Sequence, residues 1–212
     1  MTGFPTPRFF LIASTALFAA FGLSSCGSGS FSYGKDTRNK MIVSVRDQKM
    51  LLVRDGAPVK TYPISTSKFG VGDRPNSNCT PLGHLQVAKK IGDRAPTGSV
   101  FKNRRPTGEV LKPNAPGRDP VVTRILWLAG AESRNQNTFR RTIYIHGTPE
   151  ERRLGSPASY GCIRMGSKDV ADLYNRIGTG ADVFIIRGSI QSQKTSFGAA
   201  TAGKVGGFSR NS

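Results

Sequence analysis

A cysteine and a histidine in the second half of the chain have the types and spacing that nucleophilic chemistry needs. Cys162 follows a glycine in a segment of small residues, and His146 stands sixteen residues earlier, after the apolar run 143–145. A free thiol of pKa about 8.5 is mostly protonated near pH 7, so a cysteine nucleophile needs a base or a positive neighbour. An imidazole supplies that base if the strand end and the turn meet in the fold. Spacing alone leaves a second interpretation open, because an isolated cysteine and an isolated histidine are more often structural.

The residues around this pair could complete such a site. Either a backbone carbonyl or the hydroxyl of Ser159 would hold the imidazole Nδ1 in the required tautomer. The backbone amides of Gly161 and Cys162 would point to the position where an oxyanion develops. We therefore expect the turn around Cys162 and the strand end at His146 to form one site.

The elements that position the pair are predicted to be mostly β structure. The dipeptide Asp55-Gly56 between two β-rich runs indicates a hairpin turn and a meander at the start of the domain. Strands are expected at 41–45, 50–53, 59–64, 84–88, 121–128, 142–145 and 182–187.

One short helix is expected after the cysteine, over 167–177. Ser167 would cap its start, and Gly178 lies just past its end. Its apolar face has spacings of three and four and consists of Val170, Leu173, Tyr174 and Ile177.

The segment 92–119 is rich in Pro, Gly, Arg and Lys and has little periodicity. We expect a basic loop without regular structure that caps or flanks the site, and a disordered surface insertion is the equal alternative. Arg104, Arg105 and Arg118 would either bind carboxylates or be solvated loop charges.

The N-terminal segment 1–25 is predicted to be a targeting signal. One basic residue, Arg8, precedes the uncharged run 9–23, which at 15 residues is short for a membrane span. The run ends in Leu23-Ser24-Ser25-Cys26, which resembles the lipobox of bacterial lipoproteins. That resemblance implies a lipid-anchored protein of the bacterial cell envelope, facing the periplasm or wall, with Cys26 as its acylated N-terminus. An ordinary secretory signal followed by an incidental cysteine is the alternative.

Length and composition predict one folded domain with attachments. The 212 residues and 37% apolar content suffice for one sizeable core but not for a second domain. We expect a flexible tether over 26–39, the catalytic domain over 40–188 and a disordered tail over 189–212.

The net charge of +18 makes the chain strongly cationic. Nucleic acid is the usual partner of such a chain, but an exported protein does not normally meet it, and no long basic run is present. Anionic envelope polymer is the better candidate. A solvated surface that gives solubility is the alternative account of most of these charges.

The remaining thiol and imidazole are expected to have no role in the chemistry. If Cys26 is acylated, Cys79 and Cys162 could form a disulfide in an exported protein, but we expect Cys79 to be a bystander thiol. His84 lies in an alternating strand and is expected to be a structural or surface residue.

Four separated elements resemble the L,D-transpeptidase (YkuD-like) catalytic domain family. That family has a histidine, a gap of about this length, then Ser or Thr, His, Gly, Cys, an apolar residue and Asn or Arg. This chain has His146-Gly147-Thr148 and then Ser159-Tyr160-Gly161-Cys162-Ile163-Arg164. Thr80-Pro81-Leu82-Gly83 and the opening meander are also similar, so the resemblance covers about residues 41–187. Tyr160 departs from the commoner histidine, which puts the choice of acceptor in doubt.

The resemblance implies a mostly β, sandwich-like fold and peptidoglycan chemistry. Cys162 would attack a stem tetrapeptide after its meso-diaminopimelate, release D-alanine and pass the acyl group to an amine, with His146 as general base. Gly147 or Ser159 would orient the imidazole, while Arg164 would support the site or bind a substrate carboxylate, and Tyr160 would contact substrate. No metal or organic cofactor is implied.

Two other functions remain compatible with the sequence. The same acyl-enzyme could be released to water, which would make the protein a peptidoglycan carboxypeptidase or a hydrolase of protein–peptidoglycan links. A non-enzymatic cationic lipoprotein that tethers a membrane to the wall is the second. A papain-like peptidase fits less well, because there the cysteine precedes the histidine.

Overall fold

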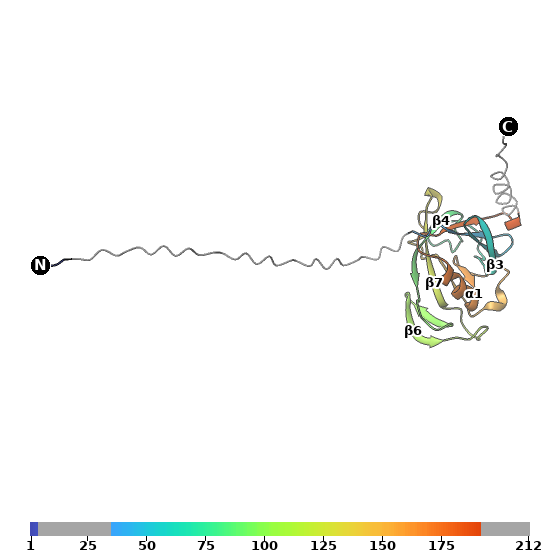
Figure 1. Ribbon diagram of the computed structural model, residues 1–212. Helices are drawn as coiled ribbons and strands as arrows, with labels where there is room; N and C mark the ends of the chain where they lie inside the picture. Colours follow the sequence, from blue (N-terminus) through green and yellow to red (C-terminus); the bar gives the residue numbers. More distant parts are fainter. Residues whose placement is uncertain (4–34, 192–212) are drawn as a thin grey trace, which may run out of the picture. The chain divides into compact units, whose positions relative to one another are not determined.

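The computed structural model describes residues 1–3 and 35–191 (Figure 1). The expected lipobox with Cys26 lies outside the described residues, as does the expected tail from residue 192 onward. Part of the expected tether belongs to the packed domain, because the Asp36 carboxylate accepts a hydrogen bond from the Gly178 amide over 2.7 Å. Within the described ranges, no helix has the length and apolar character needed to span a membrane.

The domain is mostly β, as predicted, with one α-helix among the described residues. The order of the sheet is β4-β10-β1-β2-β3-β9-β8-β7-β5-β6, and a further pairing of β4 with β7 closes the first eight of these strands into a ring. The two layers expected of a sandwich are therefore halves of one closed sheet. The strands are β1 (Asn39–Ser44), β2 (Lys49–Arg54), β3 (Ala57–Ser65), β4 (Gly83–Ile91), β5 (Ser99–Lys102), β6 (Arg105–Val110), β7 (Val121–Gly130), β8 (Tyr144–Gly147), β9 (Ile163–Met165) and β10 (Asp182–Ile186).

The opening meander is confirmed. β2 pairs antiparallel with both β1 and β3, and the β2–β3 turn has positive φ at Asp55 (51°) and Gly56 (82°). Those values suit the tight hairpin turn that an Asp-Gly pair favours.

The predicted helix is α1 (Ser167–Arg176), which packs on β7 and β8. Its start differs from the expectation, because Gly166 is the N-cap and Ser167 is the first helical residue. The carboxylate of Glu151 accepts a hydrogen bond from the Ser167 amide over 2.8 Å, so a residue distant in sequence takes the role expected of a serine cap. Glu151 lies in the 3-10 turn η2 (Glu151–Arg153), and a second such turn is η1 (Ser133–Asn135).

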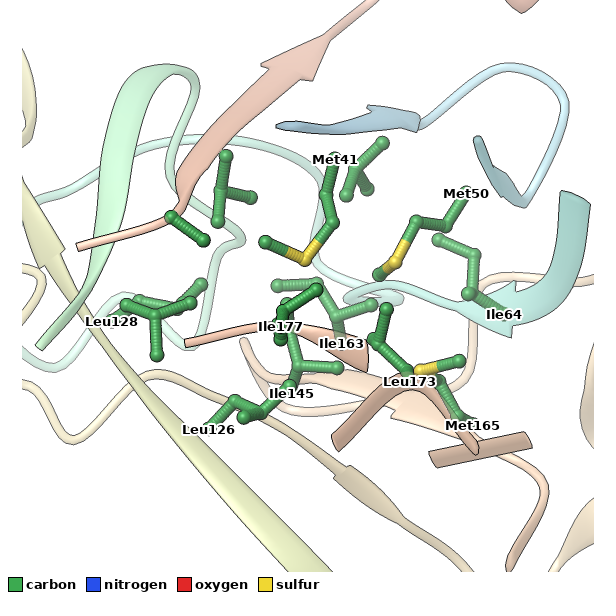
Figure 2. Packing of buried hydrophobic residues seen from close by; sticks show 14 of the residues in the cluster. Met41, Met50, Ile64, Leu126, Leu128, Ile145, Ile163, Met165, Leu173 and Ile177 are labelled. Carbon is green, nitrogen blue, oxygen red and sulfur yellow. The ribbon is translucent and has the colours of Figure 1, made fainter. Parts of the chain in front are cut away.

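The main core lies between the strands of the ring and α1 (Figure 2). Its side chains come mainly from α1 and the eight strands of the ring and point toward one another. Burial of each large apolar side chain contributes about 1.5–3 kcal/mol. Labelled members include Met41, Met50, Ile64, Leu126, Ile145, Ile163 and Leu173. This core fixes the positions of β8 and β9, which carry the reactive residues.

The prediction of an irregular loop over 92–119 is wrong, because that segment contains the β5–β6 hairpin. β6 is exposed along its whole length, so it has no alternation of apolar and polar residues that could have revealed a strand. The hairpin turns at Asn103 and Arg104, whose φ values are +51° and +66°. Near the C-terminal end of the described residues, Ile190 packs against Ile42 and Leu51. Residues 189–191 of the expected tail therefore belong to the folded part.

Candidate active site

Parallel pairing of β8 with β9 brings His146 and Cys162 together. Ile145 pairs with Ile163, and Cys162 comes directly before β9. Cys162 therefore lies beside Tyr144, whose backbone N–H donates to its Sγ over 3.4 Å. Because residues two apart in a strand face the same way, His146 and Tyr144 project from one face of β8. The strand end and the turn meet at one site, as their spacing predicted.

The Cys162 thiol is half-buried and held by backbone groups. It donates to the carbonyl of Thr142, with Sγ and O 3.6 Å apart, and accepts from the Tyr144 amide. Burial raises the pKa of Cys162 to about 11, against the opposing effects of the Tyr144 amide and the positive charge of Arg141. The thiol is therefore neutral near pH 7 in the free protein.

Thr142 presents its carbonyl from a strained backbone conformation. Its φ is +56°, in the left-handed region that β-branched residues rarely adopt. Such conformations cost on the order of 1–3 kcal/mol and cluster at functional sites. Here the strained residue contacts the Cys162 thiol directly.

The His146 imidazole is buried, and a backbone group sets its tautomer. Nδ1 lies 2.8 Å from the carbonyl oxygen of Gly147, which can only accept, so Nδ1 carries the proton and Nε2 is the free base. Burial lowers the pKa of His146, while the Gly147 carbonyl and the charge of Asp119 oppose that shift. Gly147 is required here, because a Cβ would come within 2.7 Å of the Val122 carbonyl oxygen.

Ser159 and Gly161 shape the cysteine turn rather than contact the imidazole. The Ser159 hydroxyl donates to the Cys162 carbonyl over 2.6 Å and accepts from the Gly161 amide over 3.2 Å. Gly161 has a φ of +118°, and a Cβ there would lie 3.2 Å from the Ile143 side chain. Since the Gly161 amide already donates to Ser159, the Cys162 amide is the better candidate for contact with an oxyanion.

Arg141 fixes the segment before β4 against this turn. Its guanidinium forms an ion pair with Asp73 over 2.9 Å and donates to the Cys79 carbonyl over 2.6 Å. The Arg141 and Asp73 side chains are only 8% and 4% exposed. The Thr80 hydroxyl, from the segment that resembles the family's Thr-Pro-x-Gly, donates to the Gly161 carbonyl over 3.0 Å. These contacts join two segments that are distant in sequence.

Arg164 is buried among acidic side chains. It forms ion pairs with Asp119 and, over 2.9 Å, with Glu150, and Asp119 also accepts a hydrogen bond from the Thr148 hydroxyl. These four residues are named the Arg164 cluster. Only 3% of the Arg164 side chain is exposed, so of its two expected roles the support of the site suits its position better than contact with a substrate carboxylate.

Tyr160 lies exposed beside the cysteine turn and belongs to a small surface patch. Its ring centroid is 5.4 Å from that of Phe69, and Lys68 Nζ donates to its hydroxyl oxygen over 3.0 Å. That hydrogen bond, together with the positive charge of Lys68, lowers the pKa of Tyr160. Lys68, Phe69 and Tyr160 are named the aromatic patch.

A cleft of about 310 Å³ opens beside the reactive pair. Two of its lining residues, Thr142 and Tyr144, contact Cys162 Sγ, and a third, Ile125, pairs with His146 between β7 and β8. The β5–β6 turn contributes Arg104, so this space is named the Arg104 cleft. The segment expected to flank the site does so as an ordered hairpin.

The other sequence candidates lie outside this constellation or form structural contacts. Cys79 and Cys162 are both free thiols. His84 contacts the Asp182 carboxylate over 2.8 Å and stacks on Phe184, which are structural contacts within the sheet. Over residues 35–191, no group of three or more His, Cys, Asp or Glu side chains is placed to hold a metal ion.

Sequence reasoning missed several residues that surround the pair. Asp119, Glu150, Asp73 and Arg141 come from loops or strand ends, and their partners are distant in sequence. No local pattern marks an acidic residue in a loop as the partner of a buried arginine. The strained φ of Thr142 likewise has no sequence signal, since threonine is common in strands.

The profile of the YkuD family, the L,D-transpeptidase catalytic domain, matches residues 38–185. The chain therefore belongs to the L,D-transpeptidase catalytic domain family. No curated protein matches it. Similar solved structures include an L,D-transpeptidase from Mycobacterium smegmatis (15% identity, 70% of this chain and 58% of that chain covered, TM-score 0.45). L,D-transpeptidase 3 from Mycobacterium tuberculosis with a faropenem-derived adduct has 19% identity, coverages of 70% and 60%, and a TM-score of 0.46.

An L,D-transpeptidase from Xylanimonas cellulosilytica has 17% identity, coverages of 72% and 62%, and a TM-score of 0.45. The chain spans about three fifths of the length of the structures that it matches.

Proposed function

We propose that this protein is a peptidoglycan L,D-transpeptidase that forms an acyl-enzyme on Cys162. The observation that carries the proposal is that the pairing of β8 with β9 puts a half-buried thiol and a buried imidazole on one face, beside a cleft, with the imidazole Nδ1 fixed on a backbone carbonyl. Membership of the L,D-transpeptidase catalytic domain family supports peptidoglycan as the substrate. We propose that the donor is a stem tetrapeptide cut after its meso-diaminopimelate, as the sequence resemblance implies.

In each half of the reaction, His146 accepts one proton and then gives it up. In the first half, Cys162 Sγ attacks the peptide carbonyl, His146 Nε2 takes the thiol proton, and collapse of the tetrahedral intermediate breaks the C–N bond. The departing D-alanine amine receives that proton, which leaves a thioester on Cys162. In the second half, an acceptor amine attacks the thioester and His146 takes a proton from that amine. The C–S bond then breaks, and His146 returns the proton to Sγ, which restores the thiol.

The electrostatics favour a neutral pair before the substrate binds. Burial raises the pKa of Cys162 and lowers that of His146, so both shifts oppose a thiolate–imidazolium pair in the free protein. Proton transfer would then accompany attack, when negative charge moves to the peptide oxygen. The Cys162 amide is the donor that we assign to that oxygen, with Ser159 and Gly161 holding the turn in place.

Arg164 and Tyr160 receive different roles. We assign Arg164 to support of the β8–β9 pair through Asp119 and Glu150, because its guanidinium is buried. Tyr160 is exposed next to the nucleophile, so we assign the aromatic patch to contact with the acceptor strand.

The test is mass spectrometry of muropeptides incubated with the purified chain, a donor tetrapeptide and a free amine. Cys162→Ser should lose nearly all product, and His146→Ala should lose about 10²- to 10⁴-fold in rate while keeping its fold by circular dichroism. A carbapenem should add one adduct, located on Cys162 by peptide mapping. Cross-linked product supports transfer, whereas trimmed tripeptide alone would show the hydrolytic alternative. Undiminished product from Cys162→Ser would rule out the mechanism.

We also propose that Cys26 is the acylated N-terminus of an envelope lipoprotein. The support is the sequence 9–26, in which an uncharged apolar run ends in Leu-Ser-Ser-Cys. Cys26→Ala should release the protein from membranes. Envelope protein that keeps residues 1–25, or that lacks acyl mass on Cys26, would contradict the assignment.

A further inference from the structure

Arg104 is a positive side chain that the fold holds in place without balancing its charge. Its guanidinium carbon lies 4.7 Å from the centroid of the Trp127 ring, and Nη1 donates to the Tyr144 hydroxyl over 3.2 Å. Across residues 35–191, no acidic side chain forms an ion pair with it, whereas Arg141 and Arg164 both have such partners. Most of the five N–H donors of Arg104 therefore remain available to a ligand.

The position of Arg104 in the hairpin also costs energy. The β5–β6 turn has positive φ at both Asn103 and Arg104, a conformation in which glycine is the usual second residue. A long side chain at φ +66° is uncommon, and such strain persists at positions that have a function. The strained turn places this guanidinium in the wall of the cleft that borders Cys162.

The surroundings of Arg104 favour a carboxylate ligand. An arginine presents its donors in a planar fork that matches the two oxygens of a carboxylate. Phe101, Val121 and Ile125 make part of the cleft apolar, which strengthens a charge pair formed there. Tyr144 contacts Cys162 through its backbone amide and Arg104 through its side-chain hydroxyl. A carboxylate bound by Arg104 would therefore lie about one side-chain length from the acyl group, where a carboxylate at the end of a donor side chain could reach.

We propose that Arg104 is the residue that selects donor peptides whose diaminopimelate side chain ends in a free carboxylate. This inference rests on the proposed function, since it names the part of the donor peptide that the Arg104 cleft binds. It predicts that an uncharged carboxamide at the same place makes a poor donor, because the guanidinium would then lose its water without gaining an ion pair.

The experiment compares two donor tetrapeptides that differ only in a carboxylate or a carboxamide on the diaminopimelate side chain. For the unmodified chain, kcat/KM should favour the carboxylate by about 10- to 100-fold, the range expected for a charge-assisted contact. Arg104→Gln should bring the ratio close to one. Arg105→Gln is the matched control, because it removes the same charge from the adjacent exposed residue and should keep the original ratio. Each ratio compares the two peptides on the same protein preparation. Incomplete folding therefore lowers both kcat/KM values by the same factor and leaves the ratio unchanged.

A binding measurement separates this inference from the proposed function. Calorimetric titration of the two peptides into Cys162→Ala and Cys162→Ala/Arg104→Gln chains needs no turnover. A preference for the carboxylate that disappears with Arg104 supports the inference, even if the unmodified chain fails to form product and the proposed function falls. Equal affinity for both peptides in Cys162→Ala, or an unchanged preference in the double variant, would overturn it.

Discussion

The Arg164 cluster and the Arg104 cleft both lie beside the reactive pair, yet they treat positive charge in opposite ways. Arg164 is buried and paired with two carboxylates, while Arg104 is half-buried on an aromatic ring and has no acidic partner within residues 35–191. A charge balanced inside the protein holds the backbone in place. A charge that is held but not balanced is available to a ligand. The comparison therefore separates residues that build the site from residues that choose its substrate.

The largest expected effect is on stability when the Arg164 cluster is broken. Arg164→Met should lower the free energy of unfolding by about 2–4 kcal/mol, because Asp119 would lose its cation and Glu150 would keep only the exposed Arg153. Arg104→Met should cost less than about 1 kcal/mol. Urea denaturation measures both. Equal losses in the two variants would remove the distinction between the two regions.

Asp73→Asn tests whether the Arg141–Asp73 ion pair stabilises the fold in the same way as the Arg164 cluster. The pair is buried, so its loss should cost about 2–3 kcal/mol, and the segment before β4 should become more exposed to hydrogen exchange. Asp93→Asn is a suitable control, since Asp93 and its neighbour Arg94 are both largely exposed. If Asp73→Asn lowers the free energy of unfolding by less than about 1 kcal/mol, the Arg141–Asp73 pair does not stabilise the fold as the Arg164 cluster is expected to do.

The pH dependence of Cys162 alkylation tests whether Arg141 and Arg164, the two arginines with acidic partners, lower the pKa of the thiol enough to form a thiolate. Because burial raises the pKa of Cys162 to about 11, the rate with iodoacetamide should rise steadily from pH 7 toward pH 11. The folded state holds this proton more tightly than an unfolded thiol of pKa about 8.5, so the thiol's contribution to stability is full below pH 8.5. That contribution should be lost as the pH rises from 8.5 through 11, and Cys162→Ser should abolish that loss. A rate plateau at neutral pH would instead indicate a preformed thiolate.

The smallest effect is expected at Cys79, which lies outside both regions. In the described part of the chain, its thiol forms hydrogen bonds with the backbone carbonyls of Phe69 and Ser77 and not with His146 or Cys162, so Cys79→Ser should change turnover by less than about twofold. The muropeptide assay measures this directly. A loss approaching that of Cys162→Ser would show that Cys79 takes part in the chemistry or in an oxidised form.

The sequence was informative where a local pattern determines the structure. Alternation and turn residues predicted the meander, and a single helical stretch predicted α1 closely. His146 and Cys162 could be proposed as a pair because a strand end and a glycine-flanked turn carry recognisable residues, and the pairing of β8 with β9 brings these two segments together. β6 was missed because an exposed strand lacks alternation, and the cap from Glu151 was missed because capping was assumed to be local. The partners of Arg141 and Arg164 depend on tertiary contacts, which one sequence does not display.

Closure of the sheet also bears on how the protein behaves when many copies are crowded together. A strand with unpaired backbone groups can recruit a strand from another molecule and start aggregation. In the described part of the chain, the pairing of β4 with β7 removes two such edges and leaves β6 as the end of the sheet order. β6 begins with Arg105 and Pro106 and contains Gly108, all of which discourage the addition of a further strand. The hairpin that carries Arg104 therefore also ends the sheet in a form that resists edge-to-edge association.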